Sequence, residues 1–579
     1  MKEIPQEIIK AYQNLKDIGV VNVKTPMKWT DKFKIQLEFE IEICISRNLG
    51  KKNIRNIALK VIVPENFPFD SPKFLSMDEE ITGFAHQPNN FLCLGETQGT
   101  PLDYTKLVYF VEKAKKWLDD AINEQLIKAG DPYELPYFGA LTGPQIVFSE
   151  DKVSFEKWQS YFGKVGKVQC SWAINRGNVF ALEYLDSQKK VICKTGFSSH
   201  FKNIDRQFNI TWLLLPKIVY EKHRPPKTYQ EIKNLCQKYN IDFDEVREDT
   251  CKDKQGVAIL LIGFPITKTY GEKNTEIHWQ PLYLHLSSKA CKSDSGLVLP
   301  QHATSSSLEW GWSTNVTSER LYSRGALPNT IQESHTSIVG CGAIGSIVAE
   351  FMARGGTKKI DLFDYDILLF GNLCRHTLEA MDIGRYKSIS LANKLSLINP
   401  FSEIKGHVAR IPLHSKVPIE VSEGLKNSRF IIDCTANEEA SLWLSDFAEN
   451  NEQKIVVMFF NIHAETLTLI ISNKSNSCQS ITQDLFDKIK NKKTPVEPKV
   501  YFYQPKLEDE IIEGAGCFES TFPALFIHIN MLVASAMDLI VAYVNEKPQN
   551  GLAVILQRNS RIFSSDTNEM VKITWSQEY

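Results

Sequence analysis

The sequence predicts an α/β protein whose C-terminal half is a Rossmann-like, doubly wound parallel sheet, preceded by a smaller α+β unit. Two observations lead to this class. From about Arg320 onward, short apolar runs alternate with segments of helical periodicity, as in repeated strand–helix units. A glycine-rich turn at 340–345 joins the first of these runs to the following helix. The first 130 residues instead place neighbouring strands before one long helix.

In the N-terminal segment, 1–130, two strand-like runs cover Ile35–Ser46 and Arg55–Val63, and Pro64–Pro68 interrupts the second. Leu107–Leu126 has apolar residues at helical spacing, which predicts a helix with one buried side. We therefore expect an α+β domain over this segment.

The middle region, 131–318, alternates strand-like runs such as Thr211–Leu215 and Val257–Gly263 with a helical segment at Gln230–Lys238. It contains no catalytic signature. Its αβ character allows a diverged copy of the C-terminal fold. The stretch Lys289–Ser318 is rich in Ser, Thr and Asn, which indicates a linker or extended loop at a domain boundary.

The third domain, 319–579, carries the strand–helix alternation. Its predicted strands are Ser337–Gly340, Ile360–Phe363 and Phe430–Cys434, with one helix ending at Arg354 and another beginning after Gly384. Such alternation is typical of a parallel sheet covered by helices on both faces.

Composition limits the class of protein. The 579 residues are 43% hydrophobic and 23% charged with a net charge of −2, so nucleic acid is not implied as a partner. The 12 cysteines form no CxxC pair, which argues against disulfides and structural zinc and fits a reducing cytoplasm. No secretion signal is expected at the N-terminus. The apolar stretch Ile529–Val544 is shorter than a bilayer span and is expected to be a buried helix.

The glycine turn is the first candidate site. Gly340, Gly342 and Gly345 follow a strand and open a helix, where backbone N–H groups can bind phosphate. Asp364 lies 19 residues after Gly345 at the end of the next strand, where a carboxylate can hold ribose hydroxyls. These residues alone leave both a dinucleotide and ATP possible.

Polar residues after Asp364 help to decide between a dinucleotide and ATP as the ligand. Asn372 and Arg375 come first, and Lys387 follows at the start of a predicted helix. Hydride transfer needs no such cations, whereas attack of a carboxylate on an α-phosphate requires phosphate charge to be neutralised in the transition state. Together these residues favour nucleotidyl transfer over redox chemistry.

Six segments of this domain resemble the ThiF and ubiquitin-activating adenylation family: GCGAIGS at 340–346, DLFDYD at 361–366, GNLCRH at 371–376, GRYKS at 384–388, INP at 398–400 and IIDCTAN at 431–437. The resemblance implies that Asp364 binds ribose, Asn372 and Arg375 contact the nucleotide, and Lys387 contacts phosphates. It also implies ATP, Mg²⁺ and a protein C-terminus as the acid that is adenylated.

The sequence departs from this family near the metal. The family usually has an aspartate at the position of Ala436, so Asp433 is the candidate metal ligand in its place. Arg324, upstream of the glycine turn, is a candidate for the family's triphosphate-contacting arginine, with a surface arginine as the alternative.

Cys517 is the candidate thioester acceptor. It follows Gly514 and Gly516 and precedes the apolar segment Thr521–Val533, which is predicted to be a helix. A cysteine near a helix N-terminus gains thiolate character from the helix dipole and the unpaired N–H groups. An inert core cysteine is the alternative.

The N-terminal domain contains a second candidate, Cys93. The proline-rich turn 64–72 is followed by His86-Gln-Pro-Asn-Asn90 and then Cys93, which resembles ubiquitin-conjugating domains with an HPN-type loop before the acceptor cysteine. An asparagine there could stabilise the oxyanion formed when an amine attacks a thioester, although the sequence does not distinguish Asn89 from Asn90. A buried, unreactive cysteine is the alternative.

A conjugating-type domain ahead of an activating-type domain resembles the bacterial fusion enzymes of CBASS antiphage signalling. The resemblance implies a cytoplasmic homodimer with a silent, adenylation-like middle region. It also implies a cGAS-like nucleotidyltransferase as the activated protein and an unidentified amine as its target. Three alternatives remain: a sulfur-carrier adenylyltransferase, a nicotinamide-dependent oxidoreductase and a non-catalytic binding module.

Overall fold

The structure is a computed structural model. It describes residues 3–19, 21–30, 35–46, 54–95, 99–173, 177–198, 207–252, 257–285, 291–293, 296–298, 307–413, 418–461, 464–472, 477–494, 498–501, 524–546, 551–558 and 571–578. The chain divides into two compact units, Met1–Thr317 and Ser318–Tyr579.

The N-terminal part of the first unit is an antiparallel sheet with two helices. Its elements are α1 (Gln6–Leu15), β1 (Val21–Val23), β2 (Lys28–Trp29), β3 (Gln36–Ser46), β4 (Ile54–Pro64), β5 (Lys73–Ser76), η1 (Glu79–Ile81), η2 (Pro88–Asn90) and α2 (Lys106–Ile122). The strand order is β1-β3-β4-β5, with β2 also paired to β3. The two strands and the long helix expected from the sequence are confirmed as β3, β4 and α2.

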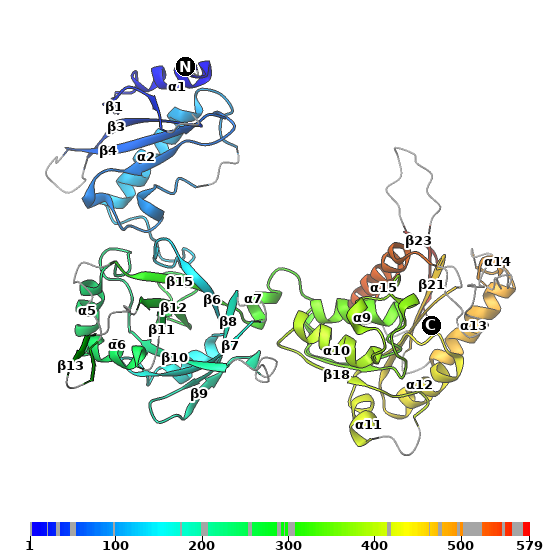
Figure 1. Ribbon diagram of the computed structural model, residues 1–579. Coiled ribbons are helices and arrows are strands. Elements are labelled where there is room, and N and C mark those ends of the chain that lie inside the picture. Colours follow the sequence, from blue (N-terminus) through cyan, green and yellow to red (C-terminus); the bar gives the residue numbers. More distant parts are fainter. Residues whose placement is uncertain are drawn as a thin grey trace. The chain divides into compact units, whose positions relative to one another are not determined.

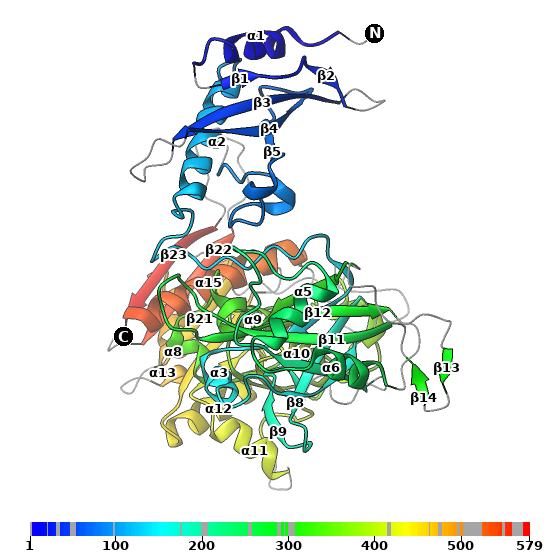
Figure 2. The same cartoon turned by 90° about the vertical axis from the view of Figure 1, so that its left-hand side faces the viewer.

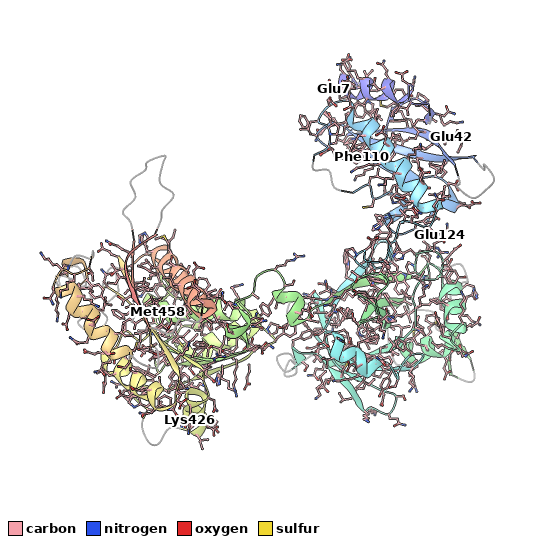
Figure 3. All side chains as sticks on the ribbon, turned by 180° about the vertical axis from the view of Figure 1, so that it is seen from behind. Glu7, Glu42, Phe110, Glu124, Lys426 and Met458 are labelled. Carbon is pink, nitrogen blue, oxygen red and sulfur yellow. The ribbon has the colours of Figure 1, made fainter. Side chains whose placement is uncertain are left out.

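Alternate residues of β3 supply the core of this sheet. Leu37, Phe39, Ile41 and Ile43 are fully or almost fully buried, as the period of a half-buried strand requires. Helix α2 packs against α1 and β3 and places Phe110 among these side chains (Figures 1, 2 and 3).

The central region is a mixed sheet that closes on itself. Its elements are β6 (Thr142–Phe148), α3 (Lys152–Trp158), β7 (Val165–Trp172), β8 (Asn178–Leu185), β9 (Val191–Lys194), β10 (Gln207–Leu214), α5 (Tyr229–Gln237), α6 (Phe243–Cys251), β11 (Val257–Ile266), β12 (Glu276–His285), β13 (Cys291–Ser293), β14 (Gly296–Val298) and β15 (Glu309–Asn315). The order is β6-β15-β12-β11-β10-β7-β8-β9, and β6 also pairs with β8, which closes the ring.

Two features of this region differ from the sequence expectation. Most strand pairs are antiparallel, so the described part is not a second doubly wound parallel sheet. The expectation of a linker over Lys289–Ser318 is wrong for Glu309–Asn315, because β15 pairs with both β12 and β6. Trp310 explains this: its side chain is buried, and its indole N–H donates to the Pro226 carbonyl at 3.2 Å.

The second unit holds an eight-stranded sheet. Its elements are α7 (Ser318–Tyr322), α8 (Asn329–Gln332), β16 (His335–Val339), α9 (Ala343–Arg354), β17 (Lys359–Phe363), η3 (Phe370–Asn372), η4 (Ala380–Asp382), α10 (Lys387–Ile398), β18 (Glu403–His407), α11 (Ile419–Lys426), β19 (Phe430–Asp433), α12 (Glu438–Asn450), β20 (Lys454–Phe460), β21 (Thr466–Ile471), α13 (Cys478–Lys490), α14 (Pro498–Tyr501), α15 (Phe526–Glu546), β22 (Leu552–Arg558) and β23 (Val571–Glu578). The order is β18-β17-β16-β19-β20-β21-β22-β23, parallel from β18 to β20 and antiparallel beyond.

Two separate cores show that the sheet is covered on both faces. Helices α9, α10 and α15 pack on one face, and α11, α12 and α13 pack on the other (Figure 1). This confirms the Rossmann-like fold expected for this half. Because β17 and β18 lie on one side of β16 and β19 lies on the other, the strand order reverses at β16. In such sheets, ligands bind at the carboxyl end of the strands beside this reversal.

Helix α15 is long and apolar enough to cross a membrane by length and composition. In the structure it packs against α9, β21 and β22, and Ile529, Leu532, Val533 and Ala536 are fully buried. The expectation of a buried helix here is therefore confirmed for this face of α15.

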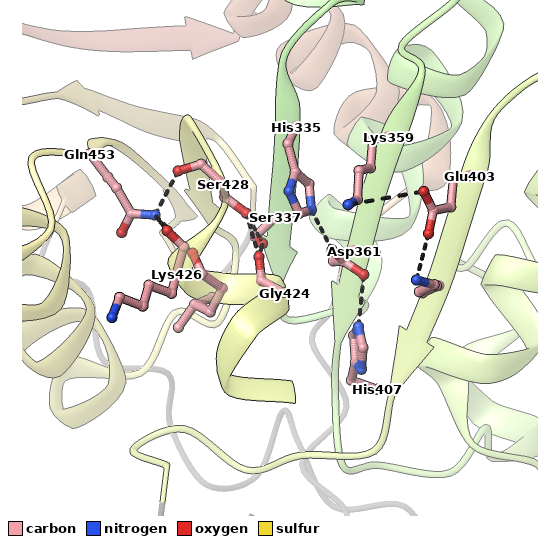
Figure 4. Close-up of polar contacts among 12 residues, drawn as sticks. His335, Ser337, Lys359, Asp361, Glu403, His407, Gly424, Lys426, Ser428 and Gln453 are labelled. Atoms are coloured by element: carbon pink, nitrogen blue, oxygen red, sulfur yellow. Dashed lines mark hydrogen bonds and ion pairs between the residues drawn. The ribbon is translucent and has the colours of Figure 1, made fainter. Parts of the chain in front are cut away.

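A polar cluster ties the first three strands of this sheet together (Figure 4). Asp361 of β17 accepts hydrogen bonds from His335 of β16 and from His407 of β18, the latter at 2.7 Å. Although burial alone would raise the Asp361 pKa, these two histidines hold it well below its usual range. Gly424 of α11 lets that helix approach the carboxylate, since a Cβ there would lie 3.2 Å from Asp361 Oδ2.

Candidate functional site

The glycine turn lies at the carboxyl end of β16, the position of the strand reversal. Gly340 has φ +86°, and a Cβ there would lie 2.9 Å from the Cys434 backbone. A Cβ on Gly345 would lie 1.8 Å from the Gly340 carbonyl oxygen. Both glycines are therefore required for the chain to pass between β16 and β19.

Gly342 has a different role from the other two glycines. It is the N-cap of α9 and provides no side-chain cap, and a Cβ there would meet nothing within 4 Å. There is therefore open space beside Gly342 at the start of α9. A helix N-terminus with free N–H groups binds anions such as phosphate, so the turn fits the phosphates of a nucleotide.

Asp364 links this turn to the end of β17. Its Oδ2 accepts a hydrogen bond from Cys341 N–H at 2.7 Å, and its Oδ1 accepts one from Asp366 N–H at 2.8 Å. Burial raises the pKa of Asp364 above its ordinary value, although both hydrogen bonds oppose that shift. The carboxylate is thus fixed beside the turn, where a ribose would lie if phosphates occupy the space near Gly342.

Lys387, the first residue of α10, lies beside the same segment. The Nζ atom of Lys387 is 3.2 Å from Asp366 Oδ2, and the backbone N–H of Lys387 donates to the Asp366 carbonyl at 2.9 Å. The adjacent Ser388 hydroxyl donates to the Asp364 carbonyl at 3.1 Å. The Lys387 side chain is only 11% exposed. A largely buried cation therefore lies close to Asp364, and Asp366 pairs with it.

Asn372 and Arg375 lie in and just after η3. The Asn372 side chain accepts a hydrogen bond from Leu369 N–H at 3.0 Å, and Arg375 N–H donates to the Asn372 carbonyl at 3.0 Å. The next residue, His376, attaches this segment to the glycine turn through a 2.6 Å hydrogen bond to the Cys341 carbonyl. Arg375 is thus one residue away from a direct contact with the turn.

His376 was overlooked as a site residue. Because Leu378 N–H donates to its Nδ1 at 3.0 Å and a carbonyl oxygen accepts from its Nε2, the ring is neutral with its proton on Nε2. Burial lowers the pKa of His376 to about 4. The only sequence signal for it was its place directly after Arg375.

Asp433 does not fit the metal-ligand role expected for it. Its side chain is fully buried. Its oxygens accept hydrogen bonds from the Thr435 N–H at 2.9 Å, the Thr435 hydroxyl at 2.7 Å and the Ser441 hydroxyl. Among the described residues, no three His, Cys, Asp or Glu side chains are grouped to hold a metal ion. Asp433 instead stabilises the turn in which Ala436 has φ +50°.

The contacts of the described residues do not connect Arg324 to the turn. Arg324 is exposed in the turn after α7, and in the part of the chain that the structure describes no hydrogen bond joins it to residues 340–345. Cys517 lies outside the described residues. The helix expected after it begins, within those residues, at Phe526 as α15.

Cys93 is exposed, so the alternative of a buried cysteine is wrong. Its backbone is nevertheless well fixed. Cys93 N–H donates to the His86 carbonyl at 2.9 Å, and Leu92 N–H donates to the Phe74 carbonyl of β5 at 2.9 Å. An exposed thiol on a fixed backbone is a suitable arrangement for a nucleophile.

The segment before Cys93 has an unusual backbone. His86, Asn89 and Asn90 have φ values of 55°, 50° and 64°. This is a left-handed backbone conformation that residues other than Gly rarely adopt. Gln87, the residue inserted into the HPN-type motif, is buried. Its side chain donates to the Ile81 carbonyl at 2.7 Å and accepts from Phe84 N–H at 3.2 Å. Such strain gathers at functional sites when surrounding contacts hold it.

Two family models match most of this chain. Residues 124–320 match the Cap2 central linker domain, and residues 321–556 match the ThiF family. Residues before 124 lie outside both of these matches.

Curated relatives agree with these matches. The ATP-dependent ubiquitin transferase-like protein Cap2 of Enterobacter hormaechei subsp. hoffmannii is 25% identical over 448 residues, which cover 74% of this chain and 72% of that protein. Cap2 of Escherichia coli is 45% identical over 69 residues, 11% of this chain and 12% of that protein. The tRNA threonylcarbamoyladenosine dehydratase 1 of Saccharomyces cerevisiae is 31% identical over 127 residues, 22% of this chain and 29% of that protein. The chain is therefore homologous to Cap2, with a Cap2-type central linker domain followed by a ThiF-family domain.

Proposed function

We propose that this protein is an ATP-dependent, E1-like enzyme that adenylates the C-terminal carboxylate of another protein. The observation that carries the proposal is the place of Lys387, a largely buried cation beside Asp364 and the glycine turn. A carboxylate oxygen attacks the α-phosphorus of ATP, the bond to the β-phosphate oxygen breaks, and pyrophosphate leaves. Lys387 and the N–H groups at the start of α9 offset the negative charge that accumulates in that transition state.

The acyl-adenylate is then captured in two thioester steps. The Cys517 thiolate attacks the acyl carbonyl and releases AMP, and the Cys93 thiolate then attacks the thioester and releases the Cys517 thiolate. Finally an amine of the target attacks the Cys93 thioester, the thiolate leaves, and an amide remains. The exposure of Cys93 and the strained segment before it support its place in this sequence.

For the activated protein we propose a cGAS-like nucleotidyltransferase of a CBASS system, with ATP and Mg²⁺ as cofactors and the cytoplasm as location. Homology to Cap2 and the ThiF match support an E1-like reaction of this kind. Since Asp433 is engaged by Thr435 and Ser441, we expect Mg²⁺ to arrive with the triphosphate, as Mg²⁺ commonly binds through substrate phosphates.

A homodimer is part of the proposal. The segment after β17 exposes large apolar side chains, which extend from Tyr365, Ile367, Leu369 and Phe370 to Met381, Ile383, Tyr386 and Ile389. An exposed apolar surface of this kind marks a contact with another protein, and a second copy of this chain is the proposed occupant. Sedimentation should give a dimer that Phe370→Glu converts to monomer. A wild-type monomer at micromolar concentration would exclude the homodimer.

The first test is exchange of labelled pyrophosphate into ATP by the purified chain, with and without a candidate carrier, that is, the protein whose C-terminus is activated. Exchange that depends on that protein and on Mg²⁺ supports adenylation. Calorimetry with NAD distinguishes adenylation from the oxidoreductase alternative. An oxidoreductase should bind NAD and should show no pyrophosphate exchange. A sulfur-carrier adenylyltransferase would show exchange but would not need Cys93.

A further inference from the structure

Glu134 connects the central region to the segment that ends in Cys93. Glu134 lies after α2, within the residues that match the central linker domain. Its carboxylate oxygen Oε2 lies 2.7 Å from His86 Nδ1 and 3.3 Å from the His86 N–H. One carboxylate therefore accepts from both the ring and the main chain of the same histidine.

The central region holds Glu134 in turn. The Tyr270 hydroxyl donates to the Glu134 carbonyl at 3.1 Å, and the same carbonyl accepts from His223 Nε2 at 3.1 Å. The neighbouring Tyr133 N–H donates to the Lys268 carbonyl at 3.0 Å. The backbone of Tyr133 and Glu134 is thus fixed to three residues far along the chain, so the position from which the Glu134 side chain extends is defined.

His86 connects Glu134 to Cys93. Its carbonyl accepts the Cys93 N–H at 2.9 Å, and its φ of 55° is one of the three left-handed values in the segment. A histidine in that conformation is held only if its surroundings determine it. The two hydrogen bonds to Glu134 are contacts that would do so.

We propose that Glu134 is a positioning residue of the central region that holds His86 and thereby the backbone of Cys93. This gives the central region a part in the transfer chemistry although it lacks a catalytic signature of its own. The consequence for transfer rests on the proposed function of Cys93 as an acceptor, whereas the restraint on the backbone does not. Because both side chains are more than one-third exposed, at 43% for His86 and 37% for Glu134, the effect comes from hydrogen-bond geometry more than from charge.

The chain offers a matched control in Lys222. This residue also joins the central region to the N-terminal domain, since its Nζ donates to the Glu80 and Thr82 carbonyls and lies 4.6 Å from the centre of the Phe84 ring. It does not touch His86. Lys222→Ala therefore removes a docking contact of similar size and leaves the Glu134 restraint in place.

The first measurement is hydrogen exchange of the Cys93 amide in the full-length chain, followed by mass spectrometry of peptides from the 86–94 segment. Glu134→Ala should speed exchange by about tenfold or more, because the acceptor of the Cys93 N–H loses its anchor. Glu134→Gln keeps an oxygen acceptor and should stay within about threefold of wild type. Lys222→Ala should leave exchange in this segment unchanged. Equal exchange in Glu134→Ala and wild type, or an equal increase in Lys222→Ala, would overturn the proposal.

The second measurement is the single-turnover rate of transfer from the Cys517 adduct to Cys93. Glu134→Ala should lower this rate by about tenfold or more while pyrophosphate exchange stays at the wild-type level, and Glu134→Gln should restore most of it. An unchanged rate in Glu134→Ala would overturn the positioning role. If wild type forms no Cys93 adduct, the proposed function of Cys93 fails, and the hydrogen-exchange result still decides whether Glu134 restrains the segment.

Discussion

Lys387 and Asp366 form an ion pair of 3.2 Å, and the backbone N–H of Lys387 also donates to the Asp366 carbonyl at 2.9 Å. Asp366 lies two residues after Asp364, whose carboxylate accepts the Cys341 N–H of the glycine turn. The pair fixes an ammonium group in a largely buried position before any nucleotide binds. A fixed cation needs no reorganisation when charge develops on a phosphate, which is the condition for strong electrostatic catalysis.

Replacing Lys387 by Ala should therefore lower carrier-dependent pyrophosphate exchange by at least ~100-fold, because its cation no longer offsets charge in the transition state. The control is Lys405→Ala, which removes an exposed lysine paired with Glu403 of the same strand, β18. That variant should exchange at the wild-type rate. Undiminished exchange in Lys387→Ala would show that Lys387 is not part of the reaction.

Gly342 and Gly345 provide a pair of variants that separate phosphate binding from folding. Ala at Gly342 meets nothing within 4 Å in the protein, so the chain should fold as wild type does, but the methyl group fills space needed by a phosphate. Ala at Gly345 would lie 1.8 Å from the Gly340 carbonyl oxygen and should distort the turn and lower stability.

Calorimetry with ATP and thermal unfolding test both variants. Gly342→Ala should lose most of its ATP affinity with a wild-type melting temperature, and Gly345→Ala should lose both. If Gly342→Ala binds ATP as tightly as wild type does, the phosphates do not lie in front of the α9 N-terminus.

His376 should make the second unit less stable at acid pH. In the folded chain its pKa is about 4, whereas an unfolded histidine titrates near 6.5. Between these values the unfolded chain binds more protons, so stability falls as pH is lowered from 6.5 to 4 and changes no further below that. The difference corresponds to about 3 kcal/mol.

Hydrogen exchange of α9 peptides, corrected for intrinsic rates, measures this effect between pH 4 and pH 7. His376→Gln cannot be protonated and should flatten the dependence. A slope in the variant equal to that of wild type would place the pH sensitivity elsewhere in this unit.

Glu150 should make the stability of the central region depend on pH in the opposite direction. Burial raises the pKa of this carboxyl to about 7, although the indole N–H groups of Trp158 and Trp279 donate to it at 2.9–3.0 Å. The folded chain keeps the proton up to about pH 7, whereas the unfolded chain releases it near 4.5. Stability should therefore fall by about 3 kcal/mol as pH rises from 4.5 to 7.

Tryptophan fluorescence during denaturation can follow this region, because Trp158, Trp212 and Trp279 are all buried there. Glu150→Gln remains neutral and should remove the slope. A wild-type slope in that variant would mean that Glu150 stays ionised and that its hydrogen-bond donors, Trp158, Trp279 and the Ser154 hydroxyl, outweigh desolvation.

Three strands of the C-terminal sheet, β16, β17 and β19, were predictable because they are continuous apolar runs that end near Gly340, Asp364 and Cys434. The antiparallel strands β21, β22 and β23 were not predicted. Parallel strands place their carboxyl ends at one edge, so residues far apart in sequence were expected to meet there. Strand β15 was not predictable in this way. Its polar composition resembles a loop, and only the burial of Trp310 and long-range pairing with β6 make it a strand.

In the candidate site, too, features set by the local sequence could be predicted, whereas features set by contacts between distant residues could not. The glycine turn is a local pattern and could be found by inspection. The engagement of Asp433 by Thr435 and Ser441, and the contact of His376 with the Cys341 carbonyl, depend on how side chains compete for partners in three dimensions. The sequence alone therefore did not show that the Asp433 oxygens are engaged within the protein, or that His376 contacts the glycine turn.

The order of the two cysteines can be tested with single substitutions. Cys517→Ala should still adenylate the carrier, because adenylation needs only the nucleotide site, but should form no thioester at either position. Cys93→Ala should accumulate a reductant-sensitive adduct on Cys517 and form no final amide, because the second acceptor is missing. Mass spectrometry of trapped adducts, with and without added thiol, distinguishes these states.

The control is Cys374→Ala, which removes another exposed cysteine, next to Arg375. It should leave the adduct on Cys93 intact, because exposure alone does not make a thiol an acceptor. If Cys93→Ala forms amide at the wild-type rate, Cys93 is not an acceptor, and the strained 86–90 segment must serve to dock the carrier or target. If Cys517→Ala still loads Cys93, the adenylate passes directly to the N-terminal domain, since no intermediate thioester is then required. Either result would replace the two-cysteine relay with a single transfer.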